Sequence, residues 1–145
     1  MQHISSNIIN AETHYIESDG TTFAYRRFGK PSTIPLVGFQ HFTGTLDNWD
    51  PLIMDGLAGE REVILFDNVG VGNTTGSTPD NVSAMAEDGV RFIKALGLQK
   101  IDVLGFSLGS FIAQYLGQYH QDLLRKIIIV GSAPQGTEIL AGFPE

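Results

Sequence analysis

Residues 101–109 read IDVLGFSLG, an apolar run that ends in the pattern Gly-x-Ser-x-Gly. The run has the composition of a buried strand, and residues 108–119 carry apolar side chains at helical spacing. A strand passes into a helix this abruptly only through a sharp turn, which forces Ser107 into a strained backbone conformation. Gly105 and Gly109, two residues to either side, leave room for the two backbones to pass. The stretch therefore predicts a strand, a tight turn and a helix around Ser107.

Apolar runs of the same kind predict the rest of the sheet. We expect strands near residues 34–40, 62–67, 100–106 and 126–131, and helices near residues 46–57, 82–96 and 108–119. Asp19-Gly20 between two alternating runs predicts an antiparallel hairpin over residues 13–29. Strands that alternate with helices are typical of the α/β class. The predicted fold is therefore a doubly wound, mostly parallel sheet with an antiparallel hairpin at its start, all within one domain over residues 1–145.

Composition narrows the classes of function. Nine Lys and Arg residues against sixteen Asp and Glu residues give a net charge of −7, which disfavours binding to nucleic acid or anionic lipid. The absence of cysteine excludes disulfides, thiolate metal sites and a cysteine nucleophile. The four histidines lack the spacing of metal ligands, so we expect neither a metal nor an organic cofactor. No apolar run is long enough to span a bilayer and no secretory signal is recognisable, which favours a cytoplasmic location.

From residue 14 to about residue 134 the chain resembles the α/β-hydrolase family. The resemblance is carried by residues 25–29 (YRRFG), residues 40–49 (QHFTGTLDNW), residues 66–74 (FDNVGVGNT) and residues 105–109 (GFSLG), which occur in the family's order. Within this family, the chain is similar to the branch of single-domain esterases, peptidases and cofactor-free haloperoxidases. Haloalkane dehalogenases and soluble epoxide hydrolases carry aspartate at the turn, so Ser107 distinguishes the chain from them.

The resemblance implies a role for each residue of the site. Ser107 would be the nucleophile that attacks a small-molecule ester, thioester, lactone or amide and forms an acyl-enzyme. The backbone N–H groups of Leu108 and Phe42 would form the oxyanion hole. The family's usual His-Gly-x is here Gln40-His41-Phe42; counting back from Trp49 selects Phe42 as the donor, whereas counting from His41 would select Thr43. His41 is interpreted as a structural loop residue.

Other residues of the resemblance have structural interpretations. The run over residues 67–72 is interpreted as a turn held by hydrogen bonds from backbone N–H groups to Asp67. The aromatic residues Phe42, Trp49 and Phe106, together with Leu108, either line an apolar pocket beside Ser107 or pack in the core.

A serine nucleophile needs an acid and a histidine that follow it in this family. After Ser107 the only histidine is His120, at the end of the predicted helix, and it is not expected to be the base. Among the later acidic residues, Glu138 is the alternative acid. The resemblance thus covers the amino-terminal half of the family's fold, truncated before the cap and the last strands, with acid and histidine beyond residue 145. We expect the isolated chain to be nearly inactive.

Two alternatives remain open from the sequence. The same serine site serves a cofactor-free perhydrolase, and a non-catalytic scaffold or binding module retains the same turn. The run of residues 127–130, IIIV, has the composition of a central strand but would lie near an open sheet edge. We therefore expect self-association, or completion by another polypeptide, through Ile127 to Val130.

Overall fold

The computed structural model describes residues 5–134 and has an α/β fold. In chain order its elements are β1 (His14–Ser18), β2 (Thr21–Gly29), β3 (Leu36–Phe39), η1 (Leu46–Asn48), α1 (Pro51–Ala58), β4 (Glu62–Phe66), α2 (Val82–Ala95), β5 (Ile101–Phe106), α3 (Leu108–Tyr119), η2 (Gln121–Leu123) and β6 (Leu124–Val130). Within the described range the strands form one sheet in the order β1-β2-β4-β3-β5-β6. β1 and β2 form the antiparallel hairpin, and β2 also pairs antiparallel with β4. The remaining pairs are parallel, which confirms the predicted fold class.

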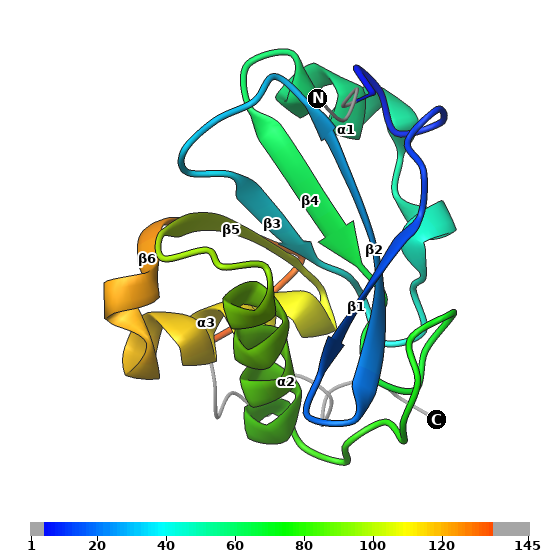
Figure 1. Cartoon of the computed structure of the whole chain (residues 1–145). Coiled ribbons are helices and arrows are strands. Elements are labelled where there is room, and N and C mark those ends of the chain that lie inside the picture. The colour runs from blue at the N-terminus through cyan, green and yellow to red at the C-terminus, as the bar shows by residue number, and fades with distance from the viewer. Residues whose placement is uncertain (1–4, 135–145) are drawn as a thin grey trace, which may run out of the picture.

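Helices cover both faces of the sheet (Figure 1). On β4, Ile64 and Phe66 point to the face covered by α2 and α3, where they pack in one apolar cluster with Phe92 and Ile112. The alternate residues of β4 belong to a second cluster, with Met54 of α1 on the other face. Strands buried on both faces explain the near-continuous apolar runs in the sequence.

The helix predicted over residues 46–57 is divided in two. Residues 46–48 form the short 3-10 turn η1, and α1 begins only at Pro51. The side chain of Asp50 caps α1 by accepting the backbone N–H of Leu52 at 2.8 Å. Because proline has no N–H and a fixed φ, it suits the first turn of a helix and cannot lie inside one. The expectation of one helix from residue 46 was therefore wrong.

An ion cluster joins three neighbouring segments at the amino ends of the strands. Asp102, near the start of β5, is fully buried; its Oδ2 lies 2.9 Å from Arg61 Nη1 and 2.6 Å from Arg125 Nη2. Arg61 directly precedes β4 and Arg125 lies on β6. The hydrogen bonds from Arg125, then its positive charge and that of Arg61, outweigh the effect of burial and hold the pKa of Asp102 below its usual value.

β6 forms one edge of the sheet over the described residues. It pairs with β5 on one side, and its residues Ile127 to Val130 are each between 38% and 46% exposed. The apolar side chains of β6, which are of the kind found in buried strands, are thus exposed to solvent. Nowhere in residues 5–134 is there a helix with the length and apolar character needed to cross a membrane.

Candidate active site

Ser107 lies at the turn between the end of β5 and the start of α3. Its φ is 54° and its ψ is −117°, a conformation that residues with a side chain rarely adopt. The helix begins at the next residue, Leu108. The predicted strand, tight turn and helix around Ser107 are thus confirmed, together with the strained backbone.

Gly105 and Gly109 occupy positions where a side chain does not fit. A Cβ on Gly105 would lie 2.7 Å from the Cα of Ser110, and one on Gly109 would lie 2.5 Å from the carbonyl carbon of Phe39. Both obstacles are backbone atoms, which cannot swing aside. The two glycines therefore let α3 pass close to β5 and to the end of β3, as the sequence pattern predicts.

The backbone of Ser107 is fixed by its neighbours. Its N–H donates to the carbonyl oxygen of Val130 at 3.0 Å, and its own carbonyl oxygen accepts the N–H of Ser110 at 2.9 Å and also the Ser110 hydroxyl. The Ser107 side chain is half-buried, and its hydroxyl has no hydrogen-bond partner among residues 5–134. Hydrogen bonds thus hold the backbone of the turn in place, whereas the Ser107 hydroxyl makes none within residues 5–134.

Two backbone N–H groups next to this turn are unpaired. Neither Leu108 N–H nor Phe42 N–H donates to another residue in the described range. Leu108 is the first residue of α3, where N–H groups lack partners within the helix and the helix dipole is positive. Phe42 lies in the loop after β3 and is 63% exposed. Both residues line the same hollow, so the structure brings them to one side of the site.

The hollow is formed by the loops after β3 and β4, by α2 and by the start of α3. Its lining residues are Phe42, Asn68, Val69, Val71, Thr78, Pro79, Met85, Asp88 and Leu108. Most of these side chains are apolar. Trp49 is not among them, because it is buried in the core on the α1 face. Phe106 is 39% exposed and packs edge-on against the His41 ring, with ring centroids 5.9 Å apart.

Asn68 is a lining residue that the sequence pattern did not single out. It follows Asp67 directly, at the carboxyl end of β4, and only 9% of its surface is exposed. No hydrogen bond to its side chain is found in the described part of the chain. The available signal was its place: a polar residue immediately after a buried strand lies at the edge of the sheet where ligands bind.

Asp67 ties together the two loops that border the hollow. Its Oδ1 accepts the backbone N–H of Leu46 at 2.8 Å, and its Oδ2 accepts that of Asn73 at 2.9 Å. The predicted structural role of Asp67 in its own turn is confirmed, and the bond to Leu46 extends that role to the loop after β3. Asp67 is 1% exposed, so these bonds are shielded from water.

The loop after β4 is also fastened to the hairpin. The hydroxyl of Thr74 accepts the N–H of Ala24 at 2.9 Å, and the hydroxyl of Thr75 accepts the N–H of Thr22 at 2.9 Å. Thr75 N–H in turn donates to the Thr22 carbonyl oxygen at 3.1 Å. Residues 74 and 75 thus pair with β2 beyond the end of β4.

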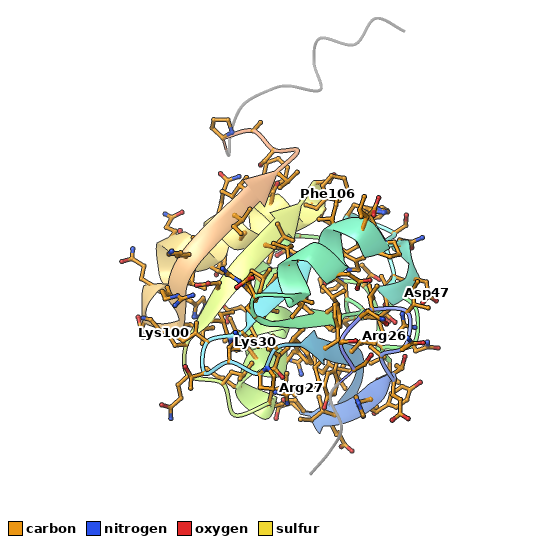
Figure 2. The ribbon with its side chains drawn as sticks, turned by 90° about the horizontal axis from the view of Figure 1, so that it is seen from above. Arg26, Arg27, Lys30, Asp47, Lys100 and Phe106 are labelled. Atoms are coloured by element: carbon orange, nitrogen blue, oxygen red, sulfur yellow. The ribbon has the colours of Figure 1, made fainter. Side chains whose placement is uncertain are left out.

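His120 lies far from the turn. It caps the carboxyl end of α3, about 18 Å along the helix from Ser107. Its Nε2 is 2.8 Å from Glu87 Oε1, and this hydrogen bond lowers the pKa of Glu87. In Figure 2, Phe106 at the carboxyl end of β5 and Lys100, directly before the start of that strand, are labelled well apart from each other.

The carbonyl oxygen of Asp122, two residues after His120, accepts a hydrogen bond from Lys100 Nζ at 2.9 Å. Glu138 and Glu145 lie outside the described residues. Within residues 5–134 no group of three or more histidine or acidic side chains is arranged to hold a metal ion. The structure thus places Ser107, Leu108 and Phe42 together and His120 elsewhere, as the sequence analysis expected for His120.

Comparisons with known proteins agree with this architecture. An alpha/beta hydrolase fold protein from Chitinophaga pinensis is 60% identical, and the structures superpose with a TM-score of 0.91 over 92% of this chain and 49% of that chain. RutD of Rhizobium rhizogenes, described provisionally as a carbamate hydrolase, is 27% identical over 112 residues, which are 76% of this chain and 42% of RutD. The poly(3-hydroxyalkanoate) depolymerase of Ectopseudomonas oleovorans is 29% identical over 120 residues, 82% of this chain and 42% of that protein.

This chain spans less than half the length of these relatives. A sequence profile of the alpha/beta hydrolase fold matches residues 35–143, which is well over half of the chain. The match begins just before β3 and includes the turn at Ser107 with both of its glycines. On this match, the sheet order and the geometry of the turn, the chain belongs to the alpha/beta hydrolase fold family.

Proposed function

We infer that Ser107 is the nucleophile of a serine hydrolase that cleaves a carboxylic ester through an acyl-enzyme. The observation that carries this function is the Ser107 turn itself. Among the described residues 5–134, the half-buried Ser107 hydroxyl has no hydrogen-bond partner, and neither do the neighbouring N–H groups of Leu108 and Phe42; the backbone of Ser107 is held by its own hydrogen bonds. A strained turn that exposes a serine at the start of a helix is the arrangement that acyl transfer requires.

The reaction proceeds in two steps. Ser107 Oγ attacks the ester carbonyl carbon while its proton passes to a base, and the N–H groups of Leu108 and Phe42 stabilise the negative oxygen. The alcohol leaves with that proton, so Ser107 carries the acyl group. Water then attacks the acyl-enzyme, which releases the acid and restores the hydroxyl. We assign the base and its acid to a segment other than residues 5–134, since His120 lies at the far end of α3 and His41 is interpreted as a structural loop residue that packs against Phe106.

The relatives support a substrate with a cleavable carbonyl. The name of one relative denotes a carbamate and that of the other a polyester of hydroxy acids. Both substrates contain an acyl carbon bonded to a leaving heteroatom. An ester is therefore the substrate class that we propose for this chain.

Labelling with a fluorophosphonate, which phosphonylates activated serines, tests this function. Two proteins are compared: the 145-residue chain, and a chimera in which this chain replaces the matching half of the Chitinophaga protein. We expect one adduct on Ser107 in the chimera, formed about 10³-fold faster than in the chain alone because the base is then present. Intact mass and peptide mapping measure both rates.

Two substitutions make the labelling result decisive. Ser107→Ala should abolish the adduct, whereas Ser77→Ala, an exposed serine in the loop after β4, should leave it unchanged. Labelling that persists in the Ser107→Ala chimera would refute a nucleophilic role for Ser107. The same conclusion follows if the Chitinophaga parent is labelled and the correctly folded chimera is not.

A further inference from the structure

The helix α3 begins without the side-chain cap that the other two α-helices of residues 5–134 have. The side chains of Asp50 and Asn81 cap α1 and α2, and each accepts a backbone N–H of the first turn at 2.8 Å. The Ser107 side chain makes no such bond to the first turn of α3. The Leu108 N–H, at the start of α3, therefore has no partner among the described residues.

The backbone carbonyl at the start of α3 is also held in a different way. In α1 the carbonyl oxygen of Asp50 accepts the N–H of Met54, four residues later, at 3.0 Å, as in a regular α-helix. The carbonyl oxygen of Ser107 instead accepts the N–H of Ser110, three residues later, at 2.9 Å, and also the hydroxyl of the same residue. Ser110 is fully buried, so water has no access to the place of its hydroxyl. One buried residue thus supplies two hydrogen bonds to one carbonyl oxygen.

That carbonyl and the Leu108 N–H belong to the same peptide unit. The unit is planar and trans, so its C=O and its N–H point in opposite directions. Hydrogen bonds that fix the Ser107 C=O on the side of Ser110 therefore also fix the direction of the Leu108 N–H, which points away from Ser110. Hydrogen bonds accepted by a carbonyl also polarise its peptide unit, which makes the N–H a stronger donor. The two bonds from Ser110 thus act on the N–H that we assign to the oxyanion hole.

We propose that Ser110 is a positioning residue of the oxyanion hole, whose hydroxyl aims and polarises the Leu108 N–H through the Ser107 carbonyl. This role deepens the function proposed for Ser107 and rests on it. Ser110 is fully buried and touches no substrate, so it acts only through the peptide unit. The competing explanation is a purely local bond, because a serine in a helix often donates to a carbonyl one turn earlier. Loss of a purely local bond would lower stability and leave the catalytic rate unchanged.

Steady-state kinetics of the chimera with the Chitinophaga protein test this role, with p-nitrophenyl acetate as the substrate. We expect Ser110→Ala to lower kcat about tenfold, less than the roughly 10²–10³-fold cost of losing an oxyanion donor outright. KM should change little, because the oxyanion forms in acylation and in deacylation alike. Ile112→Val, at a fully buried residue of the same helix, is the matched control: it costs a comparable amount of stability and should keep the wild-type kcat. An unchanged kcat in Ser110→Ala, or an effect on KM alone, would overturn the proposal.

An NMR measurement separates this role from the function of Ser107. In the 145-residue chain labelled with 15N-leucine, the backbone amide signal of Leu108 is identified from its loss in Leu108→Met. We expect Ser110→Ala to move this signal upfield, because the peptide unit is then less polarised, and Ile112→Val to leave it in place. If the wild-type chimera is inactive, the function of Ser107 fails, yet a moved Leu108 signal still supports the action of Ser110 on this N–H. A Leu108 signal that stays in place in Ser110→Ala contradicts the proposal even in an active enzyme.

Discussion

At Ser107 a residue with a side chain is held at a φ of 54°, a region that glycine enters without strain. We therefore expect Ser107→Gly to be more stable than Ser107→Ala by about 1 kcal/mol, because glycine relieves the strain but gains entropy in the unfolded chain. Urea denaturation of the two variants measures the difference in free energy of unfolding. At Ser83, in the helix α2, the same pair of substitutions should have the opposite order. Equal stability at position 107 would show that the turn is unstrained.

Local chemistry decides which residues of the site can be predicted. The roles of Gly105, Gly109 and Asp67 follow from the turn that the chain must make within a few residues, so the sequence is sufficient to predict them. Asn68 differs, because nothing in its immediate sequence shows that its amide lacks a partner. That property depends on side chains from α2 and from the loop after β3.

The ion cluster of Arg61, Asp102 and Arg125 belongs to the scale of the elements, since it joins the segment before β4 to β5 and β6. The lowered pKa of Asp102 means that the folded state favours its charged form. This stabilisation is complete above the pKa of the unfolded chain, about 3.9, and is lost as the pH falls through the folded value. We expect Asp102→Asn to cost about 1.5 kcal/mol at pH 7, because it weakens the charge-assisted hydrogen bonds to two arginines that are themselves partly exposed.

The pH profile distinguishes this cluster from simple loss of packing. Denaturation of the wild type between pH 7 and pH 3 should show stability that falls in acid, with a smaller fall in Asp102→Asn. Glu60→Gln, at an exposed carboxylate next to β4, serves as the control and should keep the wild-type profile. An identical acid profile for wild type and Asp102→Asn would contradict the lowered pKa.

Elements were predictable where burial alone determines them. The four apolar runs predicted strands because a strand covered on both faces needs apolar side chains throughout. The prediction of one helix over residues 46–57 was wrong because Thr45 and Asn48 form their own capped turn, which competes with a longer helix. Capping by Asp50 then starts a second helix three residues later.

At the scale of the whole molecule, the edge strand β6 determines how the chain behaves in isolation. Within residues 5–134 no strand pairs with its outer edge, and the side chains of Ile127 to Val130 are exposed, which favours contact with another strand. We expect the 145-residue chain to self-associate in sedimentation velocity, and Ile128→Lys to shift it towards monomer. Leu52→Lys, at a Leu that is 85% exposed on α1, should have no such effect. A wild-type chain that sediments as one monomer and unfolds cooperatively would refute this expectation.

The two threonine hydroxyls that fasten the loop after β4 to the hairpin bear on how selective the site can be. Thr74 and Thr75 hold the loop after β4 against the hairpin, so in the proposed enzyme this loop would limit the size of an acyl group bound beside Ser107. Discrimination by size would then be built into the hairpin, on the opposite side of the loop from the substrate. To broaden the range of acyl groups accepted by the proposed enzyme, the hydrogen bonds of the Thr74 and Thr75 hydroxyls would be removed before any residue of the pocket is made smaller.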